Sequence, residues 1–190
     1  PGTPVHLRVG YMPYASSTWS GVVMRGKKFY EKYLPPGSSV EFASALDGAK
    51  IAAALRTGQQ QVGYLDDVAA IQATLPAAPA AVRLVATLGL AQDQCSVLLV
   101  RADAPRFASD SAALAWLNGR SVAAPRDSCM ERFARQVLRQ PGVGAAQVVL
   151  DQNIEVITAG FRAGRIDAAV VSEPSASRLV GEGSARRVAS

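Results

Sequence analysis

The chain has 190 residues, 49% of them hydrophobic and 18% charged, which is typical of a globular protein with enough apolar material for a core. The longest charge-free stretches, 9–24 and 68–82, are too short and too interrupted for a membrane-spanning helix, which needs about 18 or more apolar residues. The net charge of +5 comes from scattered lysines and arginines, so it predicts a basic surface with a mild attraction for anions and no nucleic-acid-binding element.

The sequence also argues against enzymatic chemistry. Its single histidine, His6, lies within a strand pattern, where histidine-based general-base or nucleophilic catalysis is improbable. The two cysteines, Cys95 and Cys129, lack the spacing of a zinc site. We therefore predict a protein that is not an enzyme and has no cofactor or metal. Residues 1–4 resemble the start of a mature chain, so any export signal is expected to have been removed or never present.

Short strand patterns alternate with helical patterns from the first residues onward. A strand at 5–9 is followed by a helix that Thr18 can cap, with its apolar positions at helical spacing and a stop at 35–37. These apolar positions are Val22, Val23, Phe29, Tyr30 and Tyr33. Further strands are predicted at 40–42 and 62–64, separated by a helix over 47–57 and followed by another helix.

The rhythm changes after residue 76. A long apolar strand is predicted at 82–88, a second strand at 95–100, and a helix that begins at Ser109 or Asp110 and ends at residue 117. The first pattern then begins again, with strands at 121–124, 148–150 and 168–171 and helices at 128–139 and 154–163. Strands that alternate with helices favour parallel sheets covered on both faces.

The second half of the chain resembles the first. Residues 55–67 parallel residues 161–173: each segment has a helix end, an Arg-x-Gly stop, a short strand and then a carboxylate. The alternative is that any two βαβ units look alike. Taken as a duplication, the pattern predicts two similar three-layer α/β lobes joined by a hinge near 85–92: lobe one at 1–88 with a returning strand at 187–190, and lobe two at 89–186.

In open α/β sheets, ligands bind beyond the carboxyl ends of the strands, and two facing lobes form a cleft there. Hydroxyls beside free helix N–H groups suit a small anion, although the same residues serve as ordinary helix caps. Arg126 can pair with an anion or remain an exposed loop residue, whereas Asp66 and Glu173 favour an amine or hydroxyl or cap helices. The candidate ligand-binding residues are Tyr11, Tyr14, Ser16, Ser17, Thr18, Ser44, Tyr64, Asp66, Arg126, Ser128, Asn153 and Glu173.

Cys95 begins a predicted strand, and Cys129 begins a predicted helix that follows a different strand. If their strands are adjacent, a Cys95–Cys129 disulfide is expected in an oxidising compartment. The alternative is a thiolate at Cys129, at the beginning of a helix.

Four segments, in order along the chain, resemble the periplasmic substrate-binding proteins of ABC importers of the nitrate, sulfonate and taurine group. They are residues 7–11 (LRVGY), 54–64 (ALRTGQQQVGY), 117–125 (LNGRSVAAP) and 161–174, the last with Gly164, Asp167, Ala168, Glu173 and Pro174 at the family positions. The similarity covers nearly the whole chain.

The resemblance implies the type II periplasmic-binding-protein fold, in which two lobes close on a solute. It implies a monomeric receptor, periplasmic or membrane-anchored outside the cytoplasm, that captures a sulfonate, nitrate, taurine-like or carboxylate anion and delivers it to an ABC permease. Two departures stand out. Family members usually continue beyond this length, so a C-terminal part is expected to be missing, and residues 21–28 are not a general family feature.

Two other classes share this fold. The effector domain of LysR-type transcription regulators has a similar length but normally follows a helix-turn-helix region, which this sequence lacks. Enzymes related to thiamine-pyrimidine synthases use the same scaffold, but the cysteine-rich motif of those enzymes is also missing.

Overall fold

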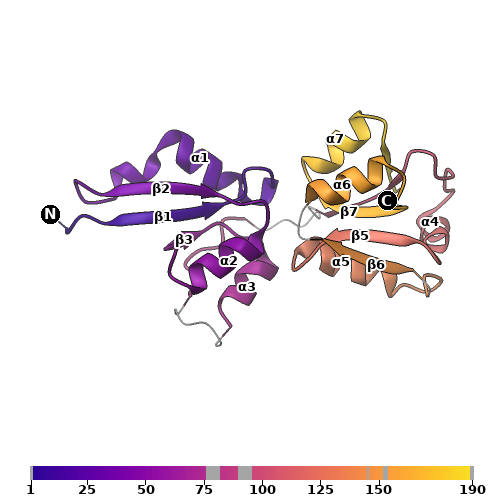
Figure 1. Cartoon of the computed structure of the whole chain (residues 1–190), viewed down its shortest axis with the longest axis horizontal. Coiled ribbons are helices and arrows are strands. Elements are labelled where there is room, and N and C mark those ends of the chain that lie inside the picture. The colour runs from indigo at the N-terminus through magenta and orange to yellow at the C-terminus, as the bar shows by residue number, and fades with distance from the viewer. Residues whose placement is uncertain (1, 76–81, 90–95, 145, 152–153, 189–190) are drawn as a thin grey trace. The chain divides into compact units, whose positions relative to one another are not determined.

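A computed structural model describes residues 2–75, 82–89, 96–144, 146–151 and 154–188. The chain divides into two compact units, Pro1–Gln92 and Asp93–Ser190, and each is described by itself (Figure 1). In the described ranges, no helix combines the length and the apolar character that crossing a membrane requires.

Unit 1 is built on a three-stranded parallel sheet in the order β2-β1-β3. Tyr11 at the end of β1 pairs with Ser44 at the end of β2, so the carboxyl ends of these strands lie at one edge. The elements of the unit are β1 (His6–Tyr11), η1 (Ser16–Thr18), α1 (Trp19–Lys27), η2 (Phe29–Lys32), β2 (Ser39–Ser44), α2 (Gly48–Arg56), β3 (Val62–Gly63) and α3 (Asp67–Ala73).

Helices α1 and α2 cover opposite faces of this sheet. A Cβ atom on Gly21 of α1 would lie 3.0 Å from the Cβ of Tyr11, whereas a Cβ on the neighbouring Gly10 would lie 2.8 Å from Ile51 of α2. Successive residues of a strand point to opposite faces, so Tyr11 faces α1 and Gly10 faces α2. Gly48 of α2 in turn lies against Ala69, which packs α3 beside α2.

Unit 2 contains a five-stranded sheet in the order β6-β5-β7-β4-β8. Strands β5, β6 and β7 are parallel, and β4 runs antiparallel to both β7 and β8. The elements are β4 (Ser96–Arg101), α4 (Asp110–Trp116), β5 (Ser121–Pro125), α5 (Cys129–Leu138), β6 (Gln147–Asp151), α6 (Ile154–Arg162), β7 (Ala168–Ser172), α7 (Ser175–Gly181) and β8 (Ala185–Arg187).

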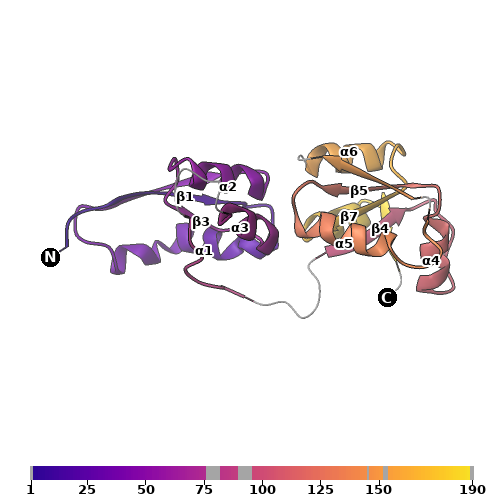
Figure 2. The ribbon, with the colours of Figure 1, turned by 90° about the horizontal axis from the view of Figure 1, so that it is seen from below.

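The strands of unit 2 are buried on both faces. On one face Val122 and Val170 join the cluster with Ala134 of α5, and on the other Ala123 joins the cluster with Phe161 of α6. Figures 1 and 2 show α5 on one side of the sheet and α6 on the other. Near-continuous apolar strands are what a parallel sheet between two helical layers requires.

The expected internal repeat is present in the topology. The order β2-β1-β3 in unit 1 matches β6-β5-β7 in unit 2, with each strand in its corresponding place along the chain. The prediction of two similar α/β lobes with mostly parallel sheets is therefore confirmed at the level of the fold.

The region predicted as one helix from Thr18 to residue 34 is broken. Lys28 adopts a left-handed conformation (φ 52°), which ends α1 and begins the short η2. After this turn, Tyr30 packs on Phe42 with ring centroids 5.7 Å apart. The expected apolar face was also wrong, because Val22, Val23, Phe29 and Tyr33 are exposed.

Two predicted strands differ from the structure. Residues 82–88 form no strand, and Val85 is 91% exposed: β-branched composition signals β propensity, but a strand also needs a ladder partner. Residues 187–190 were predicted to form a strand that returns to lobe one. The first two of them instead pair within unit 2, because Arg187 pairs with Leu99 and the N–H of Val188 donates to the carbonyl of Leu98.

Candidate ligand-binding site

The loop after β1 holds the hydroxyl cluster at the strand ends of unit 1. Thr18 is 1% exposed, and its Oγ1 donates to the carbonyl of Met12 at 2.6 Å. The predictions that its side chain caps α1 and is available to a ligand are therefore wrong. The backbone carbonyl of Ser16 accepts from the N–H of Trp19, and Ser16 itself is half-buried. Ser17 and Tyr14 are exposed and accessible to a ligand.

Tyr11 does not lie on the accessible surface. It is 2% exposed, with its ring edge-on to Phe42, and its hydroxyl accepts a 2.6 Å hydrogen bond from Arg25 of α1. The sequence marked Tyr11 as a ligand contact because it ends a strand. Strand alternation instead turns the ring under α1, and no sequence signal pointed to Arg25 as its partner.

Asp66, in the loop after β3, contacts the loop that follows β1. Its carboxylate is hydrogen-bonded to Ser17, and it makes no side-chain cap to α3, although a capping role had been the alternative for this residue. Burial raises the pKa of Asp66, the hydrogen bond from Ser17 lowers it in part, and the charge of Asp67 raises it further. Tyr64 is half-buried beside Gly21, and burial raises the pKa of its phenol. Ser44, at the end of β2, is exposed.

In unit 2 the turn after β5 is fixed by its own side chains. Asp127 has φ 56°, and its N–H donates to Glu131 at 2.7 Å. The hydroxyl of Ser128 donates to the carbonyl of Pro125 and accepts from the N–H of Glu131 at 3.2 Å, so it caps α5. The Ser-x-x-Glu spacing of a capping box was the sequence signal for Glu131.

Arg126 is exposed directly after β5. Its backbone N–H donates to the carbonyl of Asp151 at 2.9 Å, which ties the loop to β6. Its guanidinium makes a long 3.5 Å contact with the carbonyl of Leu150 and, among the described residues, no ion pair. The charge of Arg126 is therefore open to an anion.

Glu173, at the end of β7, is already engaged. Its carboxylate accepts a hydrogen bond from Arg187 of β8. It also accepts from the N–H of Ser177 at 3.1 Å, and this second hydrogen bond satisfies a free N–H in the first turn of α7. Burial alone would raise the pKa of Glu173, but the hydrogen bonds from Arg187 and Ser177 outweigh it and hold the pKa below its ordinary value. The sequence placed Glu173 correctly at a strand tip, but it gave no sign of Arg187.

The remaining predicted site residues are not described. Asn153 and Cys95 lie outside the described residues, so the ligand role of Asn153 and the Cys95–Cys129 disulfide stay predictions. The strand adjacency on which the disulfide prediction depended is wrong, because β7 lies between β4 and β5. Cys129 is half-buried at the start of α5. No group of histidine, cysteine and carboxylate residues in the described ranges could hold a metal ion.

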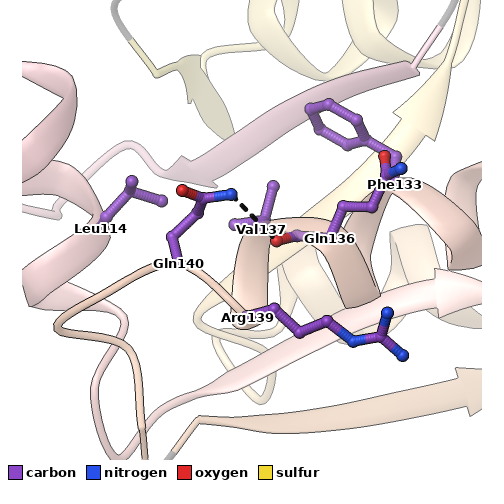
Figure 3. A pocket seen from close by; sticks show the side chains of 6 residues that line it. All are labelled: Leu114, Phe133, Gln136, Val137, Arg139 and Gln140. Carbon is purple, nitrogen blue, oxygen red and sulfur yellow. Dashed lines mark hydrogen bonds between the residues drawn. The ribbon is translucent and has the colours of Figure 1, made fainter.

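A cavity of about 440 Å³ lies away from these strand ends (Figure 3). It is lined by Leu114 of α4 and by the last turns of α5, where the side chain of Gln140 donates to the carbonyl of Gln136 at 3.4 Å. Because α5 begins at the carboxyl end of β5, its last turn lies toward the opposite edge of the sheet. The cavity is therefore separate from the candidate site of unit 2.

Comparisons with solved structures decide the fold. The alkanesulfonate-binding protein SsuA from Xanthomonas axonopodis pv. citri, bound to MOPS, is 22% identical with a TM-score of 0.76, over 100% of this chain and 62% of that protein. The periplasmic aliphatic sulphonate binding protein SsuA from Escherichia coli is 22% identical with a TM-score of 0.70, over 97% of this chain and 60% of that protein. The chain has the fold of a type II periplasmic substrate-binding protein.

The ligand binding component of an ABC-type import system from Staphylococcus aureus has the same fold at 14% identity, with a TM-score of 0.67 over 98% of this chain and 60% of that protein. The chain thus spans about three fifths of the length of these substrate-binding proteins. No protein-family model matches the sequence, and no curated protein matches it either. The sequence-based resemblance to periplasmic substrate-binding proteins is confirmed as a likeness of fold.

Proposed function

We propose that this chain is a solute-binding receptor of an ABC-type importer, which captures a small organic or inorganic anion and delivers it to a membrane permease. The observation that carries the proposal is the substrate-binding fold together with polar residues at the strand ends of both duplicated units. In such proteins the receptor makes and breaks no bond, so the proposed activity is capture and release.

The charges at the strand ends support an anionic solute. Arg126 offers a guanidinium without an ion-pair partner among the described residues, whereas the carboxylate of Glu173 is neutralised by Arg187. Tyr14 adds an exposed hydroxyl, whereas the hydroxyl of Ser17 donates to Asp66. An arginine is well suited to a planar or tetrahedral oxyanion because it donates several hydrogen bonds at once.

The proposal extends to location and partners. A receptor of this kind acts in the periplasm or on the outer side of the cytoplasmic membrane, as a monomer, with a small solute and a permease as its partners and no nucleic acid. One solved neighbour is a protein bound to MOPS, a sulfonate, which makes sulfonates the first class to test.

A thermal-shift screen of sulfonates, carboxylates, nitrate and amines tests the proposal. A bound ligand stabilises the folded state by about 2.7 kcal/mol at a hundredfold excess over Kd, so a true anion ligand raises Tm in a concentration-dependent way. Arg126→Gln should weaken an anion hit by about tenfold to a hundredfold, because a hydrogen bond to a charged group is lost.

Arg165→Gln is the matched control, because Arg165 is an exposed arginine of unit 2 that precedes β7 rather than following a strand. It should leave the affinity unchanged. Stabilisation by amines alone contradicts the anion class, and stabilisation by no solute of any class contradicts the receptor.

A further inference from the structure

The outward face of α1 is apolar, which reverses the usual amphipathic order of a surface helix. Its inward contacts come from Gly21, which lies against Tyr11 and Tyr64, and from Arg25, which reaches the hydroxyl of Tyr11. The side chains turned away from the sheet are Trp19, at 49% exposure, and Val23, at 51%. An amphipathic helix of a globular protein normally places such residues against the core.

The exposed apolar surface continues into η2. Val22 is 39% exposed, Phe29 42% and Tyr33 84%, while the inward residue Tyr30 packs on Phe42. All of these exposed side chains lie within residues 19–33, and exposed apolar side chains that gather in this way mark an interaction site. We call Trp19, Val22, Val23, Phe29 and Tyr33, together with the cations Lys27, Lys28 and Lys32, the α1 patch.

The charge of the α1 patch determines the kind of partner. Its three lysines are exposed, and one carboxylate, Glu31, lies among them, 3.7 Å from Lys28. A second exposed apolar pair of unit 1, Ile71 of α3 and Leu75 just beyond its end, follows Asp67, and α3 has no lysine or arginine. This second pair therefore lacks the combination of aromatic residues with lysines that the α1 patch has.

Exposed aromatic side chains and lysines on one helix surface fit a lipid interface. Trp and Tyr rings are favoured at the headgroup level of a bilayer, and lysines beside them are attracted to anionic headgroups. Lys32, whose Nζ lies 5.9 Å from the Phe29 ring, shows how closely the two chemistries are interleaved. We propose that the α1 patch binds the surface of an anionic phospholipid bilayer.

Vesicle binding tests this proposal directly. The chain should co-sediment with vesicles of equal parts phosphatidylglycerol and phosphatidylcholine, and not with phosphatidylcholine alone. Binding should be lost at an ionic strength of about 1 M, where the Debye length is about 3 Å. Lys27→Glu/Lys32→Glu should lower the partition coefficient by at least about thirtyfold, since each cation near an anionic surface contributes about fivefold.

Matched controls separate the patch from general charge and apolarity. Arg106→Glu/Arg165→Glu makes the same change of charge at exposed arginines of unit 2 and should leave binding within about twofold of the parent. Trp19→Ser/Val23→Ser should weaken binding while keeping its salt dependence, whereas Ile71→Ser/Leu75→Ser should not weaken it. Circular dichroism of each variant checks that the fold is intact.

Fluorescence locates the contact. The chain has 2 tryptophans, so Trp116→Phe leaves Trp19 as the sole reporter. Its emission should shift to the blue with anionic vesicles and stay unchanged with neutral ones.

Absence of binding to anionic vesicles at low salt overturns the proposal, as does binding that Lys27→Glu/Lys32→Glu leaves intact. A patch-dependent dimer, or a protein partner without vesicle binding, overturns it as well. The solute screen is a separate measurement, so failure of either proposal leaves the other standing.

Discussion

At the strand ends, some polar side chains are hydrogen-bonded within the fold and others remain accessible. The hydroxyls of Thr18 and Ser128 both donate to a backbone carbonyl. Serine and threonine side chains commonly form such hydrogen bonds with the backbone nearby in the sequence. Ser17 donates to the carboxylate of Asp66, whereas Tyr14 and Arg126 keep accessible polar atoms. Residue type alone does not distinguish the committed side chains from the accessible ones.

Asp66 makes stability depend on pH in an unusual direction. Because burial raises its pKa in the folded state above the ordinary value of 3.8, the folded state holds its proton more tightly than the unfolded state does. This contribution to stability is present below the unfolded pKa and is lost as the pH rises through the folded pKa. Asp66→Asn should therefore be more stable than the parent at about pH 7, and its advantage should vanish below about pH 4.

Urea unfolding of the two proteins across this pH range measures the difference. Asp110→Asn, at an exposed aspartate in the first turn of α4, is the control and should show no comparable pH-dependent gain. A stability difference for Asp66→Asn that grows as the pH falls would contradict the burial of this carboxylate.

Element positions followed from the sequence where local chemistry decides them. Ser109 caps α4 with its side chain as predicted, and Asp47, at the predicted start of its helix, caps α2 in the same way. Gly58 ends the turn after α2 with φ 74°. The face of α1 did not follow, because it depends on a glycine that brings the helix close to Tyr11 and Tyr64, which are far apart in the sequence. The site shows the same division: loops at strand ends were predicted, and long-range partners such as Arg187 were not.

Gly21 sets how closely α1 approaches the sheet. A Cβ there would lie 3.0 Å from both the Cβ of Tyr11 and the Cδ2 of Tyr64, whereas a Cβ on Gly26 of the same helix meets nothing within 4 Å. Gly21→Val should lower the free energy of unfolding by about 1 to 3 kcal/mol, the usual cost of overpacking. Gly26→Val, in open space, should change it by less than about 0.5 kcal/mol.

Denaturant unfolding of both variants gives the comparison. Because the two substitutions are identical and lie in one helix, differences in intrinsic helix propensity largely cancel. Equal losses at the two positions would mean that α1 does not rest on the tyrosines.

At the scale of the whole molecule, the two units have the same strand order but very different cores. Of the 28 buried hydrophobic residues among the described ones, 7 belong to unit 1 and 21 to unit 2. Of the 17 exposed large hydrophobic residues, 14 belong to unit 1. The duplication therefore repeats a topology without repeating the extent of apolar burial, and burial of apolar surface supplies most of the driving force for folding.

This asymmetry predicts how each unit behaves alone. Expressed separately, residues 93–190 should fold and unfold cooperatively, because their sheet is covered on both faces by two apolar clusters. Residues 1–92 should be at most marginally stable, because a domain of this size gains little net stability unless it buries most of its apolar side chains. Thermal melts followed by circular dichroism, with amide dispersion in NMR spectra, distinguish the two fragments. If 1–92 melts cooperatively at a higher temperature than 93–190, burial within each unit does not determine its stability.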